Sequence, residues 1–238
     1  MNKIADVPIS ILTPTYNRSK FLPLYIDNLK KFNYTKSMLE LVIDDDGDEP
    51  FISDLENFKK EVHPISVNYL RSNIRKTIGE KRNNLVKTSI NKIVCFMDDD
   101  DIYHPEYIAY SLFTLKNKKA GLVGSPQMLF VYPELDFKMT YICCEKKFQI
   151  HEATIMMTKK YFRSMGGFEK SSQGEGAKII GLQDSNVCKT DISLVMVCVA
   201  HSGNSVDKSQ FNEDRHNLNQ NLKDIEKEKV DILKSILL

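Results

Sequence analysis

The sequence predicts an α/β protein with a mostly parallel central sheet flanked by helices. Short apolar runs alternate with segments of helical spacing along the first half of the chain, which is typical of βαβ units and parallel strands. Residues 93–97 form an uninterrupted apolar run, as expected of a strand buried on both faces. This run and two others end in acidic or polar loops, which would project from one edge of the sheet.

The remaining elements follow in chain order. In the first half we expect strands at 7–12, 39–43 and 65–70, and helices at 20–32, 50–60, 78–90 and 105–115. Beyond a strand at 120–125 we expect shorter strands at 128–132, 139–144, 152–158 and 192–200, and helices at 159–164 and 177–188. We expect one domain over residues 1–210 and a helical tail over 211–238.

The tail carries sparse apolar residues at heptad-like spacing. They are Leu218, Leu222, Ile225, Ile232 and Ile236. We favour a helix that packs on its own domain over one that forms a homodimer or partner contact.

Four aspartates, residues 98–101, directly follow the expected buried strand. Adjacent carboxylates repel one another, and a hard divalent cation such as Mg²⁺ or Mn²⁺ removes that repulsion because it prefers oxygen ligands. The alternative is a solvated acidic turn. The position at the end of a buried strand favours the metal site.

Charge and cysteine usage limit the class of protein. The formal net charge is +1, from 33 basic and 32 acidic residues, so no overall field favours nucleic acid. The five cysteines form no CxxC pair, which favours a reducing compartment over a disulfide framework. The first ten residues carry no apolar signal segment, and no stretch approaches about 18 apolar residues. We therefore expect a cytoplasmic protein without a transmembrane segment, whose membrane contact is at most peripheral.

Six features in order resemble the GT-A glycosyltransferases of family 2, which are inverting enzymes that use nucleotide sugars. They are ISILTPTYNR, LVIDDDGD, Arg82-Asn83 in GEKRNN, Asp98-Asp99-Asp100, Pro105 and ATIMMTKKYFRSMGGF. The resemblance covers roughly residues 7–204. It implies a GT-A (Rossmann-like) fold with a nucleotide-sugar-binding half at 1–104 and a smaller, mixed-strand acceptor-binding half at 105–210.

The acidic motif would hold the metal and part of the donor. The resemblance implies that Asp100 ligates Mn²⁺ or Mg²⁺, and that Asp98 reaches the donor sugar, the ribose or the metal. Asp99 and Asp101 are alternatives, because a run of four aspartates leaves the register open. His201 would complete the metal shell in some members of the fold, whereas the alternative is a structural histidine.

The resemblance also implies how a nucleotide, most simply a UDP-sugar, would bind. Thr13, Thr15 and Asn17 would lie along it, and Arg82 would donate to the base or the diphosphate. Asp45 would accept from a base N–H. Asp44 and Asp46 point to the opposite strand face from Asp45, so only one register can be right.

An inverting transferase needs a base that removes the proton of the acceptor hydroxyl. The family places it in a Glu-Asp pair shortly after Gly-Gly-Phe, whereas this chain has Gly174-Glu175-Gly176. Glu175 is the first candidate for the base and Asp184 the second. The acceptor would be a hydroxyl of a glycan or of a lipid-linked or protein-linked molecule.

Other classes fit less well. A nucleotidyltransferase would open with a glycine-rich loop, which residues 13–18 lack, and a phosphatase would carry a nucleophilic aspartate at the end of its first strand. A prenyl-type synthase would carry its acids on a helix. A degenerate GT-A fold that binds nucleotide sugar or glycan as a scaffold stays open, because glycine replaces the usual aspartate at position 176.

Overall fold

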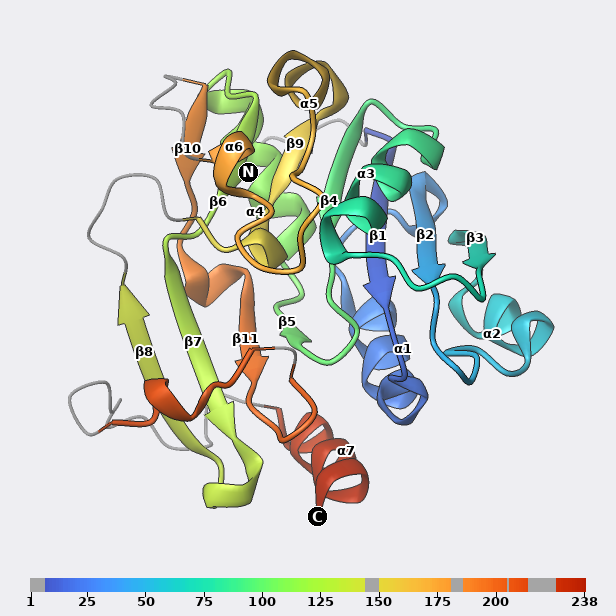
Figure 1. The fold of residues 1–238 in the computed structure, drawn as a ribbon, viewed down its shortest axis with the longest axis vertical. Helices are drawn as coiled ribbons and strands as arrows, with labels where there is room; N and C mark the ends of the chain where they lie inside the picture. Colours follow the sequence, from blue (N-terminus) through green and yellow to red (C-terminus); the bar gives the residue numbers. More distant parts are fainter. Residues whose placement is uncertain (1–6, 144–149, 181–185, 205, 214–225) are drawn as a thin grey trace.

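Two sheets form the frame of the protein (Figure 1). The computed structural model describes residues 7–143, 150–180, 186–204, 206–213 and 226–238. The large sheet has the strand order β10-β6-β9-β4-β1-β2-β3, and the small sheet has the order β5-β11-β7-β8. The α/β class and the largely parallel central sheet are confirmed.

The first half of the chain follows the predicted order of elements, except that the two-residue strand Ile102–Tyr103 was not predicted. They are β1 (Ile9–Thr15), α1 (Leu22–Lys31), β2 (Leu39–Asp45), α2 (Leu55–Val62), β3 (Ser66–Arg71), α3 (Ile78–Thr88), β4 (Ile93–Phe96), β5 (Ile102–Tyr103) and α4 (Tyr107–Asn117). Only α2 differs clearly from its expected range. It begins at Leu55 because Asp54 caps it, with the Asp54 carboxylate accepting from the Asn57 backbone N–H at 2.9 Å.

Strand β1 lies in the interior of the large sheet and pairs in parallel with both β2 and β4. The carboxyl ends of these three strands therefore meet at one sheet edge. On one face of the sheet a core forms with α1, α2 and α4, and on the other face a second core forms with α3, α5 (Lys159–Met165) and α6 (Ala177–Ile180). Both faces are thus covered, which explains why the strand residues are apolar without alternation.

The second half of the chain supplies strands to both sheets. They are β6 (Leu122–Gly124), β7 (Gln127–Tyr132), β8 (Lys138–Cys143), β9 (Met156–Thr158), β10 (Val187–Lys189) and β11 (Met196–Val199). Strand β9 runs antiparallel between β4 and β6, so the large sheet is mixed at this side. In Figure 1 the small sheet lies beside the large one, with β7 and β11 side by side.

Three predictions in this half are wrong in extent. The helix expected at 177–188 ends at Ile180 as described, and residues 187–189 instead pair in parallel with β6. The strand expected at 152–158 starts with a 3-10 turn, Glu152–Thr154, and the strand at 192–200 starts with another, Ile192–Leu194. Apolar content alone cannot separate a buried turn from a buried strand, because both are shielded from water.

The carboxyl-terminal helix α7 (Lys227–Leu237) packs on its own domain, as favoured. Val230 and Leu233 are buried, and the Lys229 ammonium donates to Asp27 Oδ2 at 2.8 Å and to Asn28 Oδ1 at 2.7 Å on α1. The homodimer contact stays a prediction.

The tail positions Leu218, Leu222 and Ile225 lie outside the described residues. In the part of the chain that the structure describes, every helix is too short or too polar to cross a bilayer.

Candidate active site

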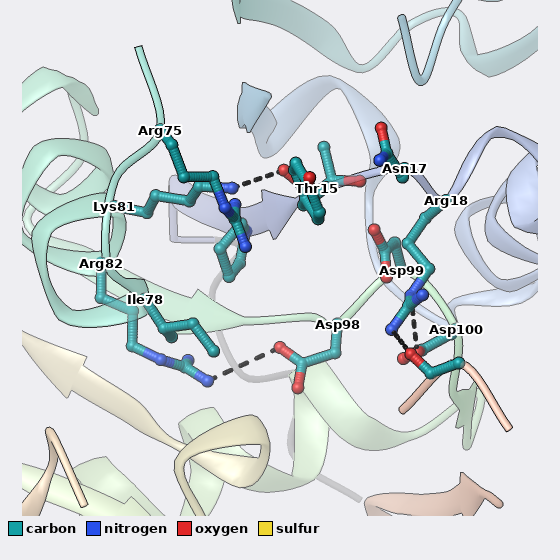
Figure 2. Close-up of a pocket in the computed structure, with 13 residues that line it drawn as sticks. Thr15, Asn17, Arg18, Arg75, Ile78, Lys81, Arg82, Asp98, Asp99 and Asp100 are labelled. Atoms are coloured by element: carbon teal, nitrogen blue, oxygen red, sulfur yellow. Dashed lines mark hydrogen bonds and ion pairs between the residues drawn. The ribbon is translucent and has the colours of Figure 1, made fainter. Parts of the chain in front are cut away.

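A cavity of about 340 Å³ opens at the edge where β1 and β4 end (Figure 2). Its wall is built from the loop after β1, from α3 and from the acidic turn after β4. Of the predicted site residues, the cavity is lined by Thr15, Asn17, Arg82, Asp98, Asp99 and Asp100. The parallel pairing of β1 with β4 thus brings two of the predicted motifs together.

Hydrogen bonds to buried residues hold the acidic turn, residues 98–101, in place. Asp98 N donates to the Tyr103 hydroxyl at 2.8 Å, and the Asp101 carbonyl accepts from Asn28 Nδ2 at 2.8 Å. The Asp101 carboxylate accepts from Val199 N at 2.9 Å on β11. Asp101 therefore serves to join the turn to the small sheet, and it does not line this first cavity.

The Asp100 carboxylate has two side-chain partners, His201 and Arg18. His201 Nε2 lies 3.1 Å from Asp100 Oδ2, and Arg18 Nε lies 3.2 Å from the same oxygen. Gly203 N donates to His201 Nδ1 at 3.1 Å, so in this tautomer the ring proton is on Nε2 and points at Asp100. His201 therefore acts here as a hydrogen-bond donor that orients Asp100.

Burial and neighbours separate the four aspartates. Burial would raise the pKa of Asp100, but the hydrogen bond from His201 and the charge of Arg18 hold that pKa below its usual value. Burial raises the pKa of Asp98, and it raises those of Asp99 and Asp101 well above the usual range. Asp100 is therefore the carboxylate that the surroundings keep ionised.

Arg82 connects the acidic turn to Glu175. Its Nη2 lies 3.7 Å from Asp98 Oδ1, and its Nε donates to Glu175 Oε1 at 3.1 Å. It lies over the Phe96 ring, 4.6 Å from the ring centroid. The Nη1 atom is buried and has no hydrogen-bond partner among the described residues. One donor of this arginine is thus free to bind a ligand group in the cavity.

Glu175 itself is buried, in a loop that docks on the start of α3. Glu175 O accepts from Glu169 N at 2.9 Å. A Cβ at Gly79 would lie 1.7 Å from the Glu169 carbonyl oxygen, so only glycine lets the loop approach the helix this closely. The second candidate for the base, Asp184, lies outside the described residues.

A second cavity of about 400 Å³ adjoins the first on the side of Glu175. Arg82 and Asp98 line both cavities, and Glu152 and Lys208 line the second. Gly176 N donates to Glu152 Oε1 at 3.3 Å, and a Cβ at position 176 would lie 2.6 Å from that oxygen. Glu152 therefore takes up the space beside the glycine that stands in place of the family's aspartate, and no pattern in the sequence predicts this contact.

In the loop after β1, Thr15 and Asn17 line the cavity as predicted, but some of their polar atoms already have protein partners. The Thr15 carbonyl accepts from Lys81 Nζ at 2.6 Å. Asn17 and Asp48 form a reciprocal pair, in which Asn17 Nδ2 donates to Asp48 Oδ2 at 2.9 Å and Asp48 N donates to Asn17 Oδ1 at 2.7 Å. Arg75 lies over the Tyr16 ring, 3.5 Å from its centroid.

Two predicted nucleotide contacts point away from the cavity. The Thr13 hydroxyl is buried against the Tyr25 hydroxyl at 2.6 Å and donates to the Met97 carbonyl at 2.7 Å. Asp45 accepts from Phe51 N at 2.8 Å and from the Tyr69 hydroxyl at 2.5 Å. Neither side chain lines the first cavity, because each is held by hydrogen bonds inside the protein, and both nucleotide contacts stay predictions.

Asp46, the neighbour of Asp45, pairs with two residues that line the first cavity. Asp46 pairs with Arg75 Nη1 at 2.6 Å and with the Lys81 ammonium. Burial would raise the pKa of Asp46, but Lys81 and the Lys76 backbone N–H lower it. Asp46 thus reaches the first cavity through Arg75 and Lys81, which line it, and the choice between the two registers stays open.

A divalent metal fits this donor set in part. Asp100 presents an ionised carboxylate at the cavity, and Asp98 Oδ1 is buried without a hydrogen-bond partner among the described residues. No group of three potential ligand side chains is preassembled in the described part of the chain. Mg²⁺ in proteins is commonly held by one or two carboxylates, with substrate phosphates and water as its other ligands.

Solved structures share this architecture. A mannosyltransferase, PcManGT from Pyrobaculum calidifontis in complex with GDP-Man and Mn²⁺, superposes with a TM-score of 0.63 at 16% identity over 87% of this chain and 59% of its own. Staphylococcus aureus TarS 1-349 in complex with UDP-GlcNAc superposes with a TM-score of 0.66 at 15% identity over 83% of this chain and 60% of its own. At these identities the likeness establishes the fold.

Sequence comparison adds two relatives and a family. The poly(ribitol-phosphate) beta-N-acetylglucosaminyltransferase TarS of Staphylococcus aureus (strain Mu50 / ATCC 700699) is 28% identical over 132 residues, which are 51% of this chain but 23% of TarS. An uncharacterized glycosyltransferase of Haemophilus influenzae is 30% identical over 98 residues, 41% of this chain and 31% of its own. The chain thus spans a minor part of these relatives. The model of glycosyl transferase family 2 matches residues 10–165, more than half of the chain, which therefore belongs to this family.

Proposed function

We propose that the protein transfers a sugar, with inversion and with the help of a divalent metal, from a nucleoside diphosphate sugar to an acceptor hydroxyl. A UDP-sugar is the first candidate donor, because TarS has been solved with UDP-GlcNAc, whereas PcManGT has been solved with GDP-Man. The acceptor is a glycan or another hydroxyl-bearing molecule, lipid-linked or protein-linked.

The observation that carries the proposal is the bridge made by Arg82. It contacts the donor-side Asp98 and the base candidate Glu175 within one pair of adjoining cavities. A donor in the first cavity and an acceptor in the second would meet between these two carboxylates. Inverting transfer requires this arrangement, since the acceptor attacks from the side opposite the leaving group.

The roles of the chain's own residues follow from their positions. Asp100, ionised and oriented by His201, would hold a Mn²⁺ or Mg²⁺ ion, with Asp98 beside it. When bound, the metal neutralises charge on the departing diphosphate. Arg82 Nη1 donates to the donor, and Glu175 takes the proton of the attacking hydroxyl.

Thermal denaturation with a panel of UDP-, GDP- and CDP-sugars, each with Mn²⁺, tests donor binding. We expect one nucleotide class to raise the melting temperature and EDTA to abolish the rise, since ligands that bind only the folded state stabilise it. The proposal fails if no nucleotide shifts the melting temperature with the metal present.

The substitution Glu175→Gln tests the base. We expect transfer to fall by about 10²–10⁴-fold, the range for a general base, while donor affinity stays within twofold. Glu152→Gln is the matched control on the same cavity. Full activity of the Glu175 variant with loss in the Glu152 variant would reassign the base to Glu152.

A binding scaffold is the second candidate function, because Gly176 stands where family members carry the aspartate. It predicts metal-dependent nucleotide binding without transfer or donor hydrolysis for any sugar. A coupled assay for released nucleoside diphosphate over the donor panel separates it from the enzyme.

A further inference from the structure

The guanidinium of Arg18 forms an ion pair with Asp100, the carboxylate that we propose as the metal ligand. Its Nε is 3.2 Å from Asp100 Oδ2, and its Nη2 donates to the Gly203 carbonyl. The two side chains are 16% and 13% exposed, so water screens the pair only in part. Figure 2 shows Arg18 pointing from the end of β1 toward Asp100, with both at the first cavity.

Three separate segments hold Arg18 in this position. Asn17 has a φ of 54° and is tied to Asp48, which directs the chain at the end of β1. The Arg18 carbonyl accepts from Phe21 N at 2.8 Å, so its backbone is fixed at the start of the next turn. A Cβ at Gly203 would lie 3.1 Å from Arg18 Nη1, so this glycine leaves room for the guanidinium. The contact is therefore a built feature of the site.

A metal ion on Asp100 and the guanidinium in its present position compete for the charge of this carboxylate. Both are cations that need the same carboxylate, and like charges at such short range repel strongly where water is scarce. A diphosphate changes this competition, because its oxygens accept bidentate hydrogen bonds from arginine. Arg18 lines the same cavity as Arg82 and Lys81, so an anion there offers Arg18 another partner.

We propose that Arg18 couples metal binding to nucleotide binding: it withholds Asp100 from a metal ion until a diphosphate takes up its guanidinium. The inference rests on the proposed function and deepens it. The site then binds free metal weakly, and metal together with nucleotide strongly. By thermodynamic linkage the metal strengthens nucleotide binding by the same factor.

Mn²⁺ binding measured by electron paramagnetic resonance, with and without UDP, tests this coupling. GDP replaces UDP if the donor panel selects it. We expect Arg18→Gln to bind Mn²⁺ alone about tenfold more tightly than the wild type, and UDP to strengthen Mn²⁺ binding by a correspondingly smaller factor. Arg163→Gln removes the same charge at an exposed position on α5 and should leave both constants unchanged.

The outcomes separate this inference from the proposed function. If the wild type binds both ligands but Arg18→Gln leaves the affinity for Mn²⁺ alone within twofold, the coupling role is wrong and the proposed function stands. If the wild type binds neither Mn²⁺ nor nucleotide, both fail together.

Arg18→Lys covers the case in which the glutamine variant does not fold. Lysine keeps the charge but lacks the planar fork that spans Asp100 and the Gly203 carbonyl. We expect Mn²⁺ alone to bind this variant about threefold more tightly than the wild type. An unchanged Mn²⁺ affinity in a folded Arg18→Lys protein would overturn the proposal.

Discussion

Two acidic clusters follow two parallel strands of one sheet, and their surroundings differ. In the β2 cluster, residues 44–46, every carboxylate has a protein partner: Asp44 pairs with Lys76 and Asn84, and Asp46 pairs with Arg75 and Lys81. In the β4 cluster, residues 98–101, one buried oxygen of Asp98 has no hydrogen-bond partner among the described residues. Its aspartates other than Asp100 have pKa values raised by burial.

The presence or absence of protein partners distinguishes acids that stabilise the fold around a site from acids that bind a ligand. Carboxylates paired within the protein are satisfied by the fold and stabilise it. Crowded carboxylates that keep a buried oxygen without a hydrogen bond, as Asp98 and Asp99 do among the described residues, lower the stability of the fold and gain from a bound cation. We therefore expect the β2 cluster to support the cavity wall through Arg75 and Lys81, and the β4 cluster to be where a cation would bind.

The largest expected effect that sharpens this comparison comes from Asp100→Asn. The change keeps the shape of the side chain and removes the charge, so we expect transfer to fall by about 10²–10³-fold and Mn²⁺-dependent nucleotide affinity to fall with it. Titration of Mn²⁺ and steady-state kinetics measure both. Asp44→Asn is the matched change in the β2 cluster, and an equal loss in Mn²⁺ affinity there would break the distinction between the clusters.

Asp45→Ala should lower the stability of the protein and leave metal binding unchanged. This change leaves Phe51 N and the Tyr69 hydroxyl without their acceptor in a buried site. The free energy of unfolding should fall by about 2–4 kcal/mol, since buried polar groups lose their partners. Urea denaturation measures it, and the folded fraction should keep the wild-type affinity for Mn²⁺. A loss of Mn²⁺ affinity without a loss of stability would assign Asp45 to the ligand site.

A smaller effect concerns pH and the buried Asp99. Because its pKa is raised in the folded state, the folded protein binds more protons than the unfolded chain above about pH 4, the ordinary aspartate pKa. This group therefore lowers stability as pH rises from there toward neutrality. Without metal, Asp99→Asn should stabilise the protein by about 1 kcal/mol more at pH 7 than at pH 4.5. Urea denaturation at the two pH values checks it, and a gain independent of pH would contradict it.

Site residues could be predicted from the sequence where polar side chains directly follow a buried strand. The β4 cluster could be predicted because its acids come at once after a buried run. The choice between Asp45 and Asp46 could not, because β2 is buried along its whole length and no alternation marks the cavity face. The same holds for Thr13 on β1, whose burial is nearly continuous.

Contacts between segments far apart in the chain could not be predicted from the sequence. Arg18 meets Asp100 across 82 positions and Gly203 across 185. Glu152 reaches the cavity only because Gly176, 24 positions later, leaves the space for it. Such pairs depend on how the two halves of the chain pack, and periodicity reports only the packing of single elements.

The smallest expected effect tests a half-buried histidine outside both clusters. Burial lowers the pKa of His151 to about 4, and its Nε2 has no hydrogen-bond partner among the described residues. Between about pH 4 and the ordinary histidine pKa of about 6.5, the unfolded chain binds the proton that the folded protein excludes, so stability falls as pH falls. His151→Gln cannot take up a proton, and should therefore lose about 1 kcal/mol less stability than the wild type between pH 7 and pH 5. Urea denaturation of the two proteins at both pH values measures this difference. His104→Gln is a matched control, and an equal change in that variant would show that the pH dependence does not come from His151.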